Sequence, residues 1–196
     1  MESKILLTRL KNRHFVFNRQ SGCKTADLIS SRRFLRSIML YMGLNKYGYT
    51  RDEIKVFLKL KTPQKIQDYL NSLKFNFEKN EETCMSPRFV INGGKAHCME
   101  GAMFAAAVLE FHGSKPLLLD LRSDKELKDY DHVVAVFKKE GCFGAISKTN
   151  HAILRYREPI YKTVRELALS YFHEYFTDKG KKNRLAYNHT THNPAE

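Results

Sequence analysis

The feature that most constrains the fold is the segment from Gly93 to Gly113, in which two glycines and a cysteine precede a run of small apolar residues. The run from Ala102 to Leu109 predicts a helix that is buried on most sides, and Gly113 predicts its end. Cys98 then lies in the first turn, where unpaired backbone N–H groups favour the thiolate over the thiol. Such a cysteine suits nucleophilic catalysis, and a packed structural thiol fits this stretch equally well.

Composition limits the class of protein. The 196 residues suit one domain of ordinary size, and an apolar content of 42% argues against global disorder. The formal charge is +13, but no block of five like charges and no nucleic-acid recognition motif accompanies it, so we do not expect a nucleic-acid partner. With no secretory signal and no run of membrane-spanning length, we expect a cytoplasmic protein without membrane contact and with reduced cysteines.

Helix signals dominate the first third of the chain. A helical pattern runs from Thr25 to Leu44, a capping-box pattern begins at Thr50, and Thr62 followed by Pro63 predicts a further helix start. We therefore expect a helical N-terminal extension packed on a core that begins at residue 62.

Strand signals follow the cysteine helix. Three apolar runs predict strands over Pro116–Leu121, His132–Phe137 and Cys142–Ser147, and a last helix is expected from near Tyr161. This order predicts an α+β fold in which an antiparallel sheet packs on the cysteine helix. The domain prediction is an extension over 1–61, a core over 62–178 and a polar tail over 179–196.

A cysteine nucleophile needs a base, and His132 is the leading candidate. It opens an apolar strand after a charged loop, so its ring can lie at the sheet edge and face the start of the Cys98 helix. The alternative is a strand-end histidine that is bonded only to backbone.

The segments Ala96–Ala102, Asp131–Ala135, Gly144–Lys148 and Arg165–Phe172 carry a resemblance to known proteins. They resemble the transglutaminase-like core of the papain-type cysteine enzymes over about residues 62–176, and more narrowly a bacterial family of transglutaminase-like proteins. The wider superfamily includes cross-linking acyl transferases, peptidases, amidases and members without catalysis, so the resemblance implies a fold without choosing an activity.

The resemblance implies Cys98 as nucleophile and His132 as base. In that superfamily the third catalytic residue is usually an aspartate on the next strand, followed by proline. In this chain that place holds Ser147, followed by Lys148. A hydroxyl can orient an imidazole, although it cannot stabilise an imidazolium as a carboxylate does. Asn150 is an equal candidate for the orienting group, whereas the side chain of Asp131 should point away from that of His132 along a strand.

Further residues near the cysteine are candidates for the cleft. The Cys98 backbone N–H is the natural first donor to an oxyanion, and Asn92 is a candidate second donor, with turn formation as its alternative. His97 is interpreted as loop packing or a pH-sensitive neighbour, because adjacent helical residues do not face each other. Glu100 is interpreted as a first-turn acid that supports the helix dipole, with a place in the cleft wall as the alternative.

Three functions remain open from the sequence. The first is a cysteine-dependent acyl-transfer enzyme, either a peptidase or amidase or a transglutaminase-type transferase, acting on a peptide or protein substrate. The second is a non-catalytic module that binds a peptide or protein, which the missing aspartate favours. The third is a basic nucleic-acid binder, whose only support is the charge. We expect no cofactor and no metal, since His189 and His192 have no further ligand nearby.

Overall fold

The computed structural model describes residues 47–78, 81–123, 130–176, 180, 182 and 186–191. All of them belong to the second of two compact units, Met42–Glu196. The helix expected between Thr25 and Leu44 lies outside the described residues, as do most of the expected N-terminal extension and Cys23.

The helices begin where the sequence carries capping signals. They are α3 (Arg51–Lys59), α4 (Pro63–Ser72), α5 (Pro87–Gly93), α6 (Cys98–Phe111), α7 (Val164–Phe172) and the 3-10 turn η3 (Ala152–Leu154). Thr50 and Glu53 form the predicted capping box of α3, and the Thr62 hydroxyl caps α4 ahead of Pro63. Helix α6 ends in front of Gly113, whose φ of 88° is the left-handed conformation that glycine adopts most readily.

The sheet has five strands in the order β6-β5-β4-β3-β7, and every neighbouring pair is antiparallel. The strands are β3 (Leu117–Arg122), β4 (His132–Lys139), β5 (Cys142–Ile146), β6 (Arg157–Tyr161) and β7 (Ala186–Thr191). A separate parallel pair, β1 (Lys74–Phe75) and β2 (Lys95–Ala96), leads into α6.

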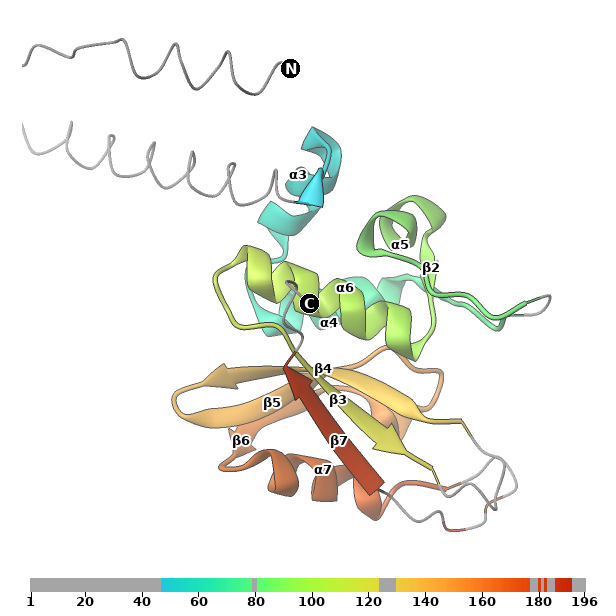
Figure 1. Ribbon diagram of the computed structural model, residues 1–196, viewed down its shortest axis with the longest axis vertical. Helices are drawn as coiled ribbons and strands as arrows, with labels where there is room; N and C mark the ends of the chain where they lie inside the picture. The colour runs from blue at the N-terminus through green and yellow to red at the C-terminus, as the bar shows by residue number, and fades with distance from the viewer. Residues whose placement is uncertain are drawn as a thin grey trace, which may run out of the picture. The chain divides into compact units, whose positions relative to one another are not determined.

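Helices cover both faces of the sheet, with α6 on one face and α7 on the other (Figure 1). Strand β4 is buried on both sides because its residues alternate between the two cores. Val133, Ala135 and Phe137 pack with α6, whereas Val134 and Val136 pack with α7. The predicted α+β class is confirmed, and the cysteine helix packs on an antiparallel sheet as expected.

One segment differs from the prediction. The polar stretch expected as a tail contains β7, which pairs with β3 at the sheet edge. Two other segments carried no prediction. The apolar residues before Gly93 belong to helix α5, because Ser86 and Pro87 supply a helix start, and the stretch from Asn150 to Pro159 contains η3 and the start of β6. In α3, Phe57 packs edge-to-face on Phe104 of α6, so this part of the extension shares the core.

Candidate functional site

Cys98 is the first residue of α6, where its backbone N–H has no partner inside the helix. The helix is fixed from both sides of this position. His97 is the N-cap residue, and its ring nitrogen Nδ1 accepts a hydrogen bond from Met99 N–H at 3.3 Å. The Glu100 carboxylate returns to His97 N–H at 2.9 Å and completes a capping box. The cysteine is therefore held at a capped helix end.

His132 is the first residue of β4 and is 5% exposed. Its Nε2 lies 2.8 Å from the Ser147 hydroxyl oxygen and 3.3 Å from the Leu154 carbonyl oxygen. Because a carbonyl can only accept, Nε2 carries the proton in this arrangement. The other ring nitrogen, Nδ1, is then left as the acceptor when the ring is neutral.

Helix α4 fixes the residue that contacts His132. The Gln67 side chain donates to the Ser147 carbonyl at 2.8 Å and accepts from the Ser147 N–H at 2.9 Å, so it binds both backbone groups of one buried residue. The next residue, Lys148, donates its ammonium group to the carbonyls of Leu70 and Leu73, at 2.8 and 2.6 Å, where α4 ends. Four hydrogen bonds from α4 thus hold the segment that orients the imidazole.

The ionisation of the Cys98 thiol depends on the His132 ring. Burial would raise the pKa of Cys98, but hydrogen bonds from His132 and then from His97, with the charge of His132 and the Val133 N–H, lower it from 9.0 to about 6. In its protonated form the thiol points to the Asp131 carbonyl oxygen at 3.8 Å. At neutral pH the site therefore holds a thiolate, which is the nucleophilic form of cysteine.

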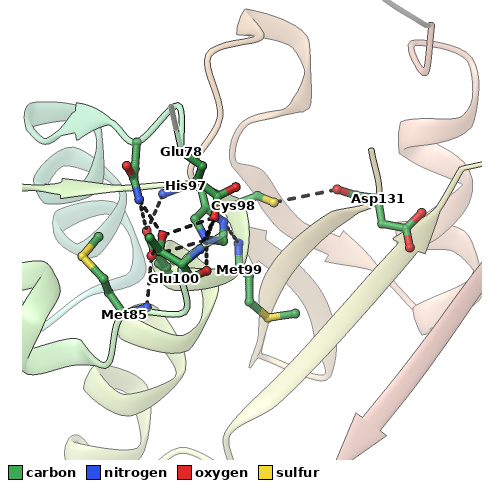
Figure 2. A network of polar contacts seen from close by, with 9 residues as sticks. Glu78, Met85, His97, Cys98, Met99, Glu100 and Asp131 are labelled. Carbon is green, nitrogen blue, oxygen red and sulfur yellow. Dashed lines mark hydrogen bonds and ion pairs between the residues drawn. The ribbon is translucent and has the colours of Figure 1, made fainter. Parts of the chain in front are cut away.

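Glu100 lies behind Cys98 in a network of buried polar groups (Figure 2). Its two oxygens accept from the Thr83 hydroxyl at 2.7 Å, the Met85 N–H at 3.0 Å and the Asn76 amide at 3.3 Å, besides the His97 N–H. Burial would raise the pKa of this carboxyl, but the hydrogen bonds, with that from Thr83 the strongest, hold it below its usual value. The first-turn acid is thus a fully buried anion and not part of a cleft wall.

In the described part of the chain, the side chains of the other predicted residues make no hydrogen bond to Cys98 or His132. Asn150 is exposed three residues beyond Ser147, and the contacts of the His132 ring go to Ser147 and Leu154 instead. Asn92 is exposed in the last turn of α5. The Asp131 carboxylate accepts from Ser123 N–H at 2.8 Å and points away from Cys98, as Figure 2 shows.

A hollow of about 500 Å³ adjoins the Glu100 network. It is lined by Phe75, Asn76, Phe77, Glu78, Glu81, Thr83 and Lys95. Asn76 and Thr83 belong to both the hollow and the network, so the network reaches from the cysteine helix to an open surface.

Sequence reasoning missed three groups that act on the pair. They are the Gln67 side chain, the Leu154 carbonyl and the Val133 N–H. A signal existed only for Gln67, which stands three residues before Leu70 on the apolar face of its helix and so should be buried. The two backbone groups carry no side-chain signal at all.

Among the described residues, no group of three or more His, Cys, Asp or Glu could hold a metal ion. The side chains of His189 and His192 lie outside the described part of the chain. No helix within the described ranges is long and apolar enough to span a bilayer.

No protein-family model matches the sequence, and no curated protein matches it. Solved structures do match, and one of them is described as "Crystal structure of a TGase". The match covers 84% of this chain with 14% identity and a TM-score of 0.34, and this chain spans 42% of the length of that one. At so low a TM-score the likeness carries no argument, and the function must be inferred from the geometry.

Proposed function

We propose that the chain is a cysteine-dependent acyl-transfer enzyme with a transglutaminase-like core, acting on a peptide or amide carbonyl through a thioester. The observation that carries the proposal is the position of Cys98 at a capped helix start, with its sulfur 3.8 Å from the carbonyl oxygen of Asp131, the residue before His132. In this position the pKa of the thiol is lowered to about 6. A thiolate that is paired with an imidazole and placed at a helix N-terminus is the arrangement that thiol nucleophiles need.

The chemistry follows from the two side chains. The sulfur of Cys98 forms a bond to the carbonyl carbon, and the π electrons of the carbonyl move to its oxygen. The unpaired Cys98 N–H at the helix start can donate to that oxyanion. When the intermediate collapses, the C–N bond breaks and the leaving nitrogen takes from Nδ1 of His132 the proton that the Cys98 thiol transferred there on ionising. This leaves a thioester and a neutral imidazole.

The second half of the reaction regenerates the thiolate. Water or an amine attacks the thioester, and His132 removes a proton from the attacking group through Nδ1. The C–S bond then breaks, and its electrons return to the sulfur. Transfer to water gives hydrolysis, and transfer to an amine gives an amide.

The experiment uses p-nitrophenyl acetate, an activated acyl donor, with the full chain. We expect a burst of p-nitrophenolate and an acetyl group on Cys98, located by peptide mass spectrometry and released by hydroxylamine. Cys98→Ser and His132→Gln should abolish the burst. Cys84→Ser is the matched control, because Cys84 is an exposed free thiol, and it should react as the native chain does.

The result that would overturn the proposal is acetylation shared equally among Cys84, Cys98 and Cys142, or a burst that His132→Gln leaves unchanged. One observation favours the alternative of a catalytically inactive module that binds a peptide or protein. The Nε2 of His132 contacts a hydroxyl and a carbonyl, and no carboxylate of the described residues bonds to it. Absence of an acyl adduct in the same experiment would decide for that alternative.

A further inference from the structure

Among the residues that the structure describes, the carboxylates of this site lie around His97 and not around His132. The Nε2 of His97 lies 3.0 Å from the Thr83 carbonyl oxygen, 3.4 Å from a Glu100 oxygen and 3.5 Å from a Glu78 oxygen. Figure 2 shows this ring between the two glutamates and next to Cys98. A carboxylate, the group that Ser147 replaces in the transglutaminase-like pattern, is thus present in the site, but it lies beside His97.

The hydrogen bonds of His97 couple its protonation to the thiol. Its Nε2 must donate, since the Thr83 carbonyl only accepts. In the neutral ring, Nδ1 is then free to accept the Met99 N–H and cap the helix. In the charged ring, Nδ1 carries a proton and cannot accept from Met99; that proton is available to the Cys98 thiolate, whose charge favours the charged ring. Nδ1 cannot accept from Met99 and donate to Cys98 at the same time. Protonation of Nδ1 therefore replaces the helix cap by a donor available to the Cys98 sulfur.

We infer that His97, held as an imidazolium by Glu100 and Glu78, is a positioning residue that stabilises the Cys98 thiolate in place of the carboxylate that His132 lacks. The inference rests on the proposed function, because it concerns the ionisation of the same nucleophile. The two histidines then have different roles. His97 keeps a fixed charge between its carboxylates, and His132, with neutral partners, carries the proton to and from the reacting groups.

Two features of Glu78 hold a carboxylate beside the His97 ring. Glu78 has a φ of 47°, a left-handed conformation that a non-glycine residue keeps only where its surroundings hold it. Its oxygen accepts from Thr83 N–H at 2.6 Å, which directs the carboxylate toward the ring. Burial would lower the pKa of His97, but hydrogen bonds to Cys98 and Thr83, with the charges of Glu100 and Cys98, raise it to about 9.

Within the described ranges, few other charged groups lie near this ring. Lys95 and Glu81 are exposed and line the adjoining hollow with Glu78. His132 approaches the sulfur from β4, and the Asp131 carboxylate is turned toward Ser123.

The test is the pH dependence of iodoacetamide labelling at Cys98, between about pH 5 and pH 10, with His97→Asn. Asparagine is a strong N-cap residue, so this variant supplies a side-chain cap to the helix and removes the charge. Loss of an opposite charge at contact distance should raise the pKa of the thiol by about 1 to 3. We therefore expect the labelling midpoint at a higher pH and, near pH 5, labelling that is about 10-fold to 1,000-fold slower. Cys84 and Cys142 serve as internal reference thiols in the same samples.

His112→Asn is the matched control. His112 caps the other end of α6, where its Nε2 lies 2.9 Å from the Phe57 carbonyl oxygen, so the same substitution there should leave the Cys98 midpoint unchanged. Glu78→Gln removes one of the two supporting charges at a hollow-lining position and should move the midpoint in the same direction by a smaller amount.

An unchanged midpoint in folded His97→Asn would overturn the inference. If that variant does not fold, the native chain decides, because the Cε1–H resonance of His97 should titrate near pH 9, and a midpoint near 6.5 would overturn the inference. These results do not depend on turnover. If the proposed function fails, Cys98 carries no acetyl adduct after treatment with p-nitrophenyl acetate, although its thiol still ionises at low pH.

Discussion

The hydroxyl oxygen of Ser147 lies 2.8 Å from Nε2 of His132, and both side chains are buried. With the Leu154 carbonyl at 3.3 Å from the same nitrogen, this contact keeps the proton on Nε2 and leaves Nδ1 as the acceptor of the neutral ring. A neutral pair of acceptors thus fixes the tautomer of the ring that we propose as the base.

Replacing Ser147 by alanine should slow acylation of Cys98 without abolishing it. One hydrogen bond to the ring is lost, worth about 1 kcal/mol or roughly a fivefold change in rate, while Leu154 still fixes the tautomer. The measurement is the p-nitrophenolate burst rate. Ser170→Ala is the control, since that hydroxyl bonds the Leu167 carbonyl on α7, and an equal loss of rate there would contradict the prediction.

Replacing Gln67 by leucine should lower both stability and rate. The change leaves the buried N–H and C=O of Ser147 unpaired, at about 1 to 3 kcal/mol for each group. Urea denaturation measures the free energy of unfolding. Gln64→Leu makes the same substitution at an exposed position of α4 and should unfold close to the native chain.

Acid should destabilise the protein through Glu100. The pKa of this carboxyl is lowered in the folded chain from 4.5, so its contribution is complete above about pH 4.5 and is lost as the pH falls through the folded value. Glu100→Gln should be less stable at neutral pH and should show a shallower loss of stability in acid. Parallel acid profiles for the two proteins would contradict this assignment.

Gly101→Ala should destabilise the fold by about 1 to 3 kcal/mol, because the added Cβ would overlap the Cβ of Lys148. Lys148 cannot retreat while its ammonium group bonds the end of α4. Gly93→Ala is the control. Its nearest neighbour would be the Lys95 Cγ at 3.9 Å, so thermal unfolding should show little change or a gain of about 0.4 to 1 kcal/mol.

Local signals were enough to predict much of this fold. Capping residues and apolar periods predicted α3, α4, α6 and the strands β3 to β5, since each signal acts within a few residues of the element it fixes. Strand β7 was not predicted, because its pairing with β3 depends on a partner more than sixty residues away and its own residues are mostly polar.

Only part of the candidate site could be predicted from the sequence. Cys98 and His132 stand at element starts, where sequence pattern says most, and Ser147 follows from counting along a hairpin. The buried ring of donors around Glu100, with Asn76, Thr83 and the Met85 N–H, joins segments whose approach depends on tertiary packing. A polar residue in a loop gives no sign in the sequence that a buried carboxylate will accept its hydrogen bond.

Helix α4 contributes no reacting group, yet Gln67 and the carbonyls of Leu70 and Leu73 hold Ser147 and Lys148 in place. Anyone grafting the sulfur and the imidazole onto another scaffold would have to transplant this helix with them. A graft without α4 would leave the His132 ring free to rotate, so the smallest segment that could be transplanted with the site begins at residue 63.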